Sequence, residues 1–196
     1  MIKWDESLGF GTLEFSVKAD QYDLAYWDKY VSYRSNPIGE KLMKARADLV
    51  GKYTEGDVVD IGIGSGHFID VRKSRTFGYD VNPQAIRWLL DRGLWWDPYF
   101  RDPDAITCWD SLEHMNRPDA LVRCAKNLIF VSIPIFMDAG HAARSKHYRP
   151  DEHFWYFTRN GLVGWMKRYG FQLLEENKME TDLGREDIGT FVFKTA

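Results

Sequence analysis

Short apolar runs alternate along the chain with segments in which apolar side chains recur every three or four positions. The first pattern predicts buried strands, and the second predicts amphipathic helices. Because helical segments separate most of the strands, the order predicts an α/β fold: a doubly wound, mainly parallel seven-stranded sheet that ends in an antiparallel hairpin. The expected strands cover residues 58–61, 76–81, 94–96, 105–109, 128–135, 171–174 and 190–193.

The N-terminal quarter has its own pattern. A weak alternation at Leu13, Phe15 and Val17 predicts a strand or an arm. Residues 20–34 then carry tyrosines at helical spacing, for which the favoured interpretation is a helix that packs an aromatic stripe on the core. The alternative is a lid whose rings cover a ligand. The tyrosines are Tyr22, Tyr26, Tyr30 and Tyr33.

We expect a single domain. In it, residues 1–54 form an N-terminal helical and aromatic extension or lid, and residues 55–194 form the core. Ser35, Asn36 and Pro37 predict the start of the helix that leads from the extension to the core.

The stretch from Val58 to Phe68 reads Val-Val-Asp-Ile-Gly-Ile-Gly-Ser-Gly-His-Phe, a strand followed by alternating glycines. Glycines in this pattern let the backbone turn sharply and leave room for a ligand. A strand, a glycine turn and a helix form the usual entrance of a nucleotide site in an α/β fold. The dinucleotide fingerprint needs its third glycine one residue later, where this chain has His67, so a dinucleotide is not favoured.

Two carboxylates accompany this turn. Asp60 precedes the first glycine and is expected to bind a ligand amine or to order the amides of the turn. Asp80 ends the next strand, twenty residues later, where a carboxylate can accept hydrogen bonds from both hydroxyls of a ribose. The alternative role for Asp80 is to cap the helix that starts at Asn82. The ribose interpretation is favoured because strand end, spacing and glycine turn agree.

Composition narrows the class of protein. Of the 196 residues, 44% are hydrophobic and 28% charged, as in globular domains, and a net charge of −3 gives no broad basic surface for nucleic acid. Cys108 and Cys124 form no metal-binding pattern, and no apolar run approaches the length of a membrane span. We therefore expect a cytoplasmic protein with reduced cysteines and no membrane partner.

Several segments resemble the class I S-adenosylmethionine-dependent methyltransferases. They are Val-Val-Asp-Ile-Gly-Ile-Gly-Ser-Gly from Val58, Gly-Tyr-Asp-Val-Asn-Pro from Gly78, Asp-Ala-Ile-Thr-Cys-Trp-Asp-Ser-Leu-Glu-His from Asp104, Val-Ser-Ile-Pro from Val131 and His-Phe-Trp-Tyr-Phe-Thr from His153. The last is similar to the small-molecule branch that includes the ubiquinone-type O-methyltransferases. The resemblance implies a Rossmann-like fold, S-adenosyl-L-methionine as methyl donor and a small-molecule acceptor.

The resemblance also implies which residues hold the cofactor. Asp60 and the glycine turn would hold its methionine part, and Asp80 with Val81 its ribose. Trp109 and Asp110 would face the sulfonium, a cation that carboxylates and ring faces favour. The turn residues concerned are Gly62, Ile63, Gly64 and Gly66.

The usual Gly-Asp that meets the adenine is absent after the third strand. Trp95, Trp96 and Asp97 stand in that neighbourhood. Trp96 could stack on the adenine and Asp97 could accept a bond from its amine; the alternative is that the tryptophan rings belong to the core.

Two histidines are candidate catalytic bases. His114 follows the fourth strand and His153 begins the last aromatic run, and both belong to the carboxyl side of the sheet. A base is useful if the acceptor is a hydroxyl or a carbon acid. Each histidine has a structural alternative, a hydrogen bond at a helix entry or beneath a lid. His141, His147 and His153 are spaced too loosely for a metal site, so no metal is expected.

Two rival functions stay open: a methyltransferase that acts on protein or nucleic acid, and a non-catalytic S-adenosylmethionine-binding module. DNA base methylation is not favoured, because Asp-Ser-Leu-Glu stands where that class has Asn/Asp-Pro-Pro-Tyr/Phe. The sequence identifies neither the acceptor nor the oligomeric state.

Overall fold

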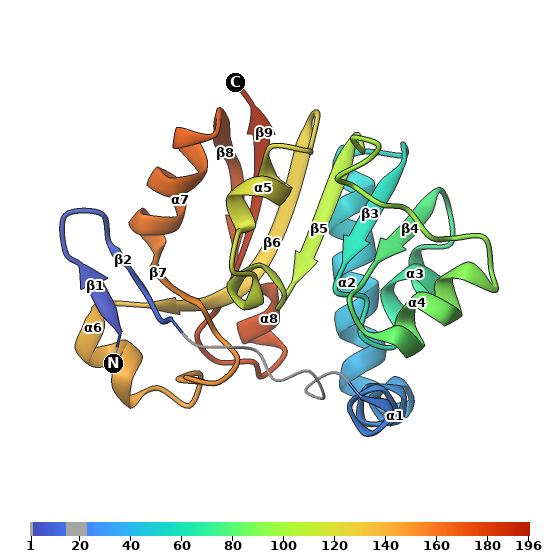
Figure 1. Ribbon diagram of the computed structural model, residues 1–196, viewed down its shortest axis with the longest axis horizontal. Helices are drawn as coiled ribbons and strands as arrows, with labels where there is room; N and C mark the ends of the chain where they lie inside the picture. The colour runs from blue at the N-terminus through green and yellow to red at the C-terminus, as the bar shows by residue number, and fades with distance from the viewer. Residues whose placement is uncertain (1, 15–22) are drawn as a thin grey trace.

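The computed structural model describes residues 2–14 and 23–196. These residues form one nine-stranded sheet with helices on both faces (Figure 1). The parallel centre runs in the order β4-β3-β5-β6, which confirms the predicted α/β class. Its strands are β3 (Val58–Ile61), β4 (Thr76–Tyr79), β5 (Ala105–Trp109) and β6 (Leu128–Phe136). Every residue of β3 and β5 is buried, as expected for strands covered on both faces.

Beyond β6 the sheet divides into two branches. In one, β9 (Ile188–Thr195) pairs antiparallel with β6, and β8 (Phe171–Asn177) pairs with β9, which confirms the terminal hairpin. In the other, β7 (Trp155–Thr158) lies parallel to the end of β6. The hairpin of β1 (Lys3–Asp5) and β2 (Phe10–Thr12) extends that branch along β7.

Helices connect the strands and cover both faces. They are α1 (Leu24–Ser32), α2 (Pro37–Tyr53), α3 (His67–Arg72), α4 (Pro83–Leu90), α5 (Pro118–Val122), α6 (Ala139–Arg144), α7 (Arg159–Arg168) and α8 (Met179–Asp182), with short 3₁₀ turns η1 (Tyr33–Ser35) and η2 (Leu112–His114). The predicted start of α2 is confirmed, since the Asn36 side chain accepts a bond from the amide of Ile38 and Pro37 is the first helical residue.

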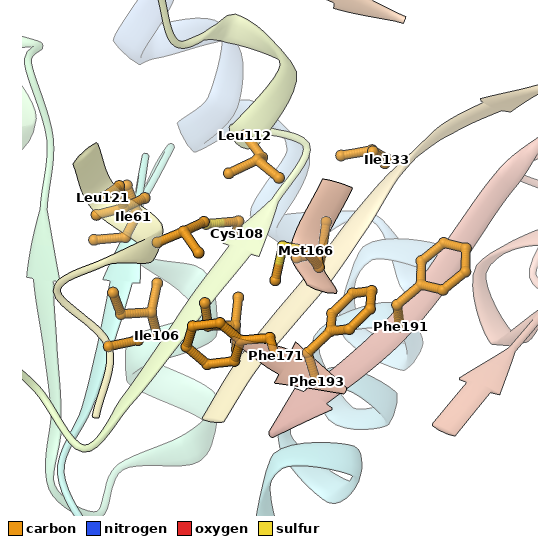
Figure 2. Close-up of a cluster of buried hydrophobic side chains, with 14 of the residues drawn as sticks. Ile61, Ile106, Cys108, Leu112, Leu121, Ile133, Met166, Phe171, Phe191 and Phe193 are labelled. Atoms are coloured by element: carbon orange, nitrogen blue, oxygen red, sulfur yellow. The ribbon is translucent and has the colours of Figure 1, made fainter. Parts of the chain in front are cut away.

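Buried apolar side chains fill both sides of the sheet. On one side they come from the central strands and from α5, α7 and the hairpin of β8 and β9 (Figure 2). Leu112, at η2, and Cys108, at the end of β5, belong to this cluster and lie just below the carboxyl edge of the sheet. On the other side Leu49 and Val50 of α2 pack with Phe68 of α3. Packed apolar side chains therefore support the carboxyl edge of the sheet from both sides.

The predicted count of seven strands is wrong, because β1, β2 and β7 join the sheet and residues 94–96 do not form a strand. Several predicted boundaries also differ from the structure. Residues 94–96 make a single bridge, from Trp95 to Gly78, rather than a third strand. The first strands lie at 3–5 and 10–12, ahead of the alternation predicted at Leu13; Phe15, Val17 and Tyr22 lie outside the described residues. The predicted helix over 118–127 ends at Val122, and the polar stretch 137–153 contains α6. In the described ranges, no helix combines the length and apolar character needed to cross a bilayer.

Candidate active site

The glycine turn between β3 and α3 has the backbone that its sequence predicts. Gly62, Gly64 and Gly66 have φ angles of 74°, 53° and 74°, in the left-handed region that favours glycine. A Cβ atom on Gly62 would lie 2.9 Å from the side chain of Ser111, and one on Gly66 would lie 2.6 Å from the ring of Trp88. The turn therefore needs glycine both for its conformation and for the close approach of its neighbours.

Asp60 lies at the end of β3, beneath this turn. It is 2% exposed, and Thr107 Oγ1 of the neighbouring strand donates a hydrogen bond to it at 2.7 Å. Burial raises the pKa of Asp60 to about 7, although the hydrogen bond from Thr107 and the charge of Arg46 lower it. The carboxylate is thus oriented by the sheet itself and stands next to the ligand side of the turn.

Asp80 stands at the end of β4, next to the glycine turn. Its Oδ1 accepts a bond from the amide of Asn82 at 2.8 Å, and the Asn82 side chain in turn caps α4 through the amide of Gln84. Burial raises the pKa of Asp80 to about 6, while hydrogen bonds from backbone amides that include Ile63 and Gly64 lower it. Because Asn82 caps the helix, Asp80 is available for the ribose that its position predicts.

Of the residues predicted to contact the adenine, one lies in the core and the others lie closer to the surface. Trp96 is 7% exposed; its ring centroid lies 4.9 Å from that of Phe77, and its indole nitrogen donates to the carbonyl of Arg101 at 2.6 Å. Trp96 therefore packs in the core, which was the alternative to stacking on the adenine. Asp97 is half-buried and accepts a bond from its own loop, whereas Val81 is 62% exposed beside Asp80. Asp97 and Val81 keep an accessible place near the predicted adenine.

The turn after β5 presents polar atoms without partners. Trp109 is 6% exposed and Ser111 8% exposed. Among the described residues, neither the indole nitrogen of Trp109 nor the hydroxyl of Ser111 has a hydrogen-bond partner. Unpaired buried donors are costly, so we expect water or a ligand to satisfy these two groups. Asp110, between them, is instead paired with Arg46 and Arg185.

His114 and His153 meet at the same edge of the sheet. Their ring centroids are 4.5 Å apart and the rings are perpendicular. Phe154 donates its amide to the carbonyl of Glu113 at 2.8 Å, which brings the start of the last aromatic run onto the η2 turn. The Glu113 side chain is 2% exposed, and its Oε2 has no partner in the described part of the chain. The sequence reasoning missed Glu113, although its place beside His114 was a signal.

Burial keeps this histidine pair uncharged. Burial lowers the pKa of His114, and it lowers the pKa of His153 to about 3. The charge of a protonated His114 lowers the pKa of His153 further. Burial and the charge of Asp110 raise the pKa of Glu113 well above its ordinary value. Donor atoms of Glu113, His114 and His153 lie within 4.8 Å of one another. Among the described residues, this set could hold a metal ion, and it differs from the combination of His141, His147 and His153 that the sequence excluded.

Helix α1 lies across the glycine turn. A Cβ atom on Gly64 would lie 3.3 Å from the ring of Tyr30, and Trp27 packs against the apolar cluster beneath the turn. An ion pair between Arg34 and Asp70 joins the end of this segment to α3. No residue of α1 is fully buried. The helix is therefore docked, with one tyrosine facing the turn, and the alternative in which the rings cover a ligand stays a prediction.

Replacing Tyr30 with alanine is expected to raise the dissociation rate of S-adenosylhomocysteine about tenfold, because the ring covers the turn and aromatic packing contributes on this scale. Stopped-flow displacement measures the rate. Tyr33→Ala is the matched control, since Tyr33 belongs to the same stripe but is 51% exposed. A loss of thermal stability with an unchanged dissociation rate would show that Tyr30 only packs.

Comparison with known proteins identifies the family of this chain. A family model described as a methyltransferase domain matches residues 30–176. A ubiquinone biosynthesis O-methyltransferase from Paraburkholderia phytofirmans is 30% identical over 131 residues. That match covers 55% of each protein, so the chain spans about half the length of this curated relative.

Solved structures agree in fold. Magnesium protoporphyrin IX methyltransferase from Synechocystis PCC 6803, with bound SAH, superposes with a TM-score of 0.58 at 14% identity, over 90% of this chain and 97% of that one. The [4+2]-cyclase SpnF superposes with a TM-score of 0.61 at 15% identity, over 94% and 98%. At such identities the likeness shows the fold alone, and the cyclase illustrates that one fold hosts different reactions.

Proposed function

We propose that this chain, which belongs to the methyltransferase domain family, is an S-adenosylmethionine-dependent methyltransferase, and we propose an acceptor class and a set of acid–base residues for it. The acceptor is a small organic molecule whose nucleophile is a hydroxyl or an acidic carbon. The observation that carries this proposal is the uncharged pair of His114 and His153 at the carboxyl edge of the sheet, 4.5 Å between ring centroids.

The residues at this edge fit the cofactor. Glycines in the left-handed region bring the backbone close to Ser111, and the carboxylate of Asp80 lies beside their amides. The unpaired donors on Trp109 and Ser111 add polar atoms for a ligand to satisfy. We assign the methionine side to Asp60 and the glycine turn, and the ribose to Asp80. When bound, the cofactor supplies an electrophilic methyl group on a positively charged sulfur.

The protein's task is then alignment, exclusion of water and removal of one proton. We assign proton removal to His153, since a neutral imidazole can accept the proton that the acceptor loses as its new bond to carbon forms. His114 packs against it and orients it. Glu113, when ionised, would stabilise the imidazolium that results. The lid formed by α1 and the buried surroundings of His153 keep water from the reacting atoms.

The test has two stages. Calorimetry with S-adenosylhomocysteine is expected to give saturable one-to-one binding; its absence would remove the cofactor assignment. Turnover is then followed with labelled S-adenosylmethionine on a panel of phenols, catechols, aliphatic alcohols and carbon acids. Binding without turnover on the whole panel would favour a non-catalytic module, whereas a salt-sensitive shift with oligonucleotides would favour a nucleic-acid acceptor.

A chelator separates two uses of Glu113, His114 and His153. If these residues move a proton, EDTA leaves kcat within about twofold of its starting value, because no cation takes part. Activity that is lost with EDTA and restored by a divalent cation would make the three residues metal ligands instead.

Two coarser features are part of the same proposal. Residues 1–54 act as extension and lid for a single domain whose core is 55–194, consistent with the docking of α1 on the glycine turn. Cys108 and Cys124 are free, which suits a reducing compartment and therefore a cytoplasmic location.

A further inference from the structure

Four charged side chains from distant parts of the chain meet behind the turn that follows β5. Arg46 of α2 bonds to Glu180 of α8 at 2.8 Å and to Asp110 at 3.1 Å. Arg185, just after α8, forms a two-pronged pair with Asp110 at 2.8 and 3.0 Å and also pairs with Glu180. Arg46 is 5% exposed and Glu180 is fully buried. The four charges cancel, and each is held by at least two bonds.

Asp110 is the unusual member of this cluster. Its φ angle is 55°, in the left-handed region that side chains other than glycine rarely adopt. Burial by itself would raise the pKa of Asp110. The charges of Arg185 and Arg46 outweigh this effect and hold the pKa below its ordinary value, so the carboxylate stays ionised. The cluster thus stabilises a backbone conformation that is unfavourable by itself.

The residues on either side of Asp110 carry buried polar atoms. Trp109 and Ser111, on either side of it, carry the buried indole nitrogen and hydroxyl that have no partner in the described residues. The side chain of Ser111 faces Gly62 of the glycine turn. The guanidinium of Arg46 also lies 5.0 Å from the centre of the Trp109 ring. A different φ angle at Asp110 would move Ser111 away from the glycine turn, whereas Trp109 is held in β5 and packs on Phe68 at 5.5 Å between ring centroids.

We propose that Arg185, Glu180 and Arg46 are positioning residues for the cofactor: by holding Asp110 in the left-handed conformation they keep the Ser111 hydroxyl beside the glycine turn, where it donates to S-adenosylmethionine. The proposal rests on the cofactor use stated above and is independent of the acceptor. It gives the segment between β8 and β9 a part in cofactor binding, although that segment is far from the glycine turn in sequence.

The test measures S-adenosylhomocysteine affinity by calorimetry. Arg185→Ala is expected to weaken binding at least tenfold, since Asp110 loses its two-pronged partner. Adding Asp110→Gly should recover most of this loss, because glycine adopts the left-handed conformation without support. Adding Asp110→Ala removes the same carboxylate but keeps the Cβ atom, and should recover little. A merely structural ion pair would not distinguish glycine from alanine.

Arg75→Ala is the matched control. Arg75 forms a two-pronged pair with Asp57 at 2.8 and 2.9 Å, just before β4 and β3 begin, at the opposite end of the sheet. It should leave affinity within about twofold of the parent. Equal affinities for the glycine and alanine double variants, or parental affinity for Arg185→Ala, would overturn the proposal. If the parent protein does not bind S-adenosylhomocysteine at all, the cofactor assignment itself is wrong. A lack of turnover with the acceptor panel bears on neither the cofactor assignment nor this proposal.

Discussion

Replacing His153 with phenylalanine is expected to lower kcat by about 10²- to 10⁴-fold, the usual contribution of a general base. Phenylalanine keeps a ring against His114 and Tyr156 and removes only the nitrogen atoms. Because burial lowers the pKa of His153 to about 3, the imidazole is neutral above pH 5, and its own titration does not shape the pH profile there. The same low pKa makes it a weak base unless a carboxylate stabilises its protonated form. Steady-state kinetics with the acceptor found by the panel measures the effect.

The pH profile adds an independent check. Burial raises the pKa of Glu113, so its carboxyl group ionises only as the pH rises, and the ionised form stabilises a protonated His153. We therefore expect kcat to increase with pH in the parent and to lose this dependence in Glu113→Gln. His147→Phe is the control, because His147 lies on the same loop and its ring bonds to the carbonyl of Glu186 at 2.9 Å. This variant should keep the parental kcat and its dependence on pH. An unchanged kcat in His153→Phe would refute the base assignment.

Asp80→Asn is expected to weaken S-adenosylhomocysteine binding about 100-fold, since hydrogen bonds to a charged acceptor contribute more than those to a neutral amide. The parent should also bind more weakly as the pH falls through about 6, where its carboxylate becomes protonated, and the variant should not. Calorimetry between pH 5 and 8 measures both effects.

Thermal stability tests the capping alternative for Asp80. A folded-state pKa above the ordinary value means that ionisation costs stability as the pH rises through about 6. The uncharged asparagine should therefore leave Tm equal or higher at pH 7.5, whereas a capping role predicts a lower Tm. Asp91→Asn, at the C-terminal end of the same helix, is the control.

Local patterns were enough to predict the centre of this fold. The alternation of buried strands with capped helices gave β3 to β6, and glycine spacing gave a turn whose φ angles the structure confirms. Asp80 was singled out because it follows a strand at a fixed distance from Asp60, and its role toward the ribose stays a prediction. Each of these signals lies within a few residues of sequence.

The features that sequence reasoning missed depend on contacts between distant segments. Arg46 and Glu180 are 134 positions apart, and nothing near either residue indicates the pairing. Trp96 was a candidate for the adenine because a tryptophan next to a nucleotide site fits a ligand as well as a core; only its packing on Phe77 decides. Glu113 became part of the site through a backbone bond from Phe154.

The cancellation of charge around Asp110 has a consequence for product exchange. Because the two arginines and two carboxylates of that cluster sum to zero, Asp60 and Asp80, when ionised, leave negative charge unbalanced at the proposed cofactor site. Methyl transfer turns a sulfonium cation into a neutral thioether, so this negative potential attracts the spent cofactor less than the fresh one. Electrostatics would thus favour replacement of the product by a new methyl donor after every turnover.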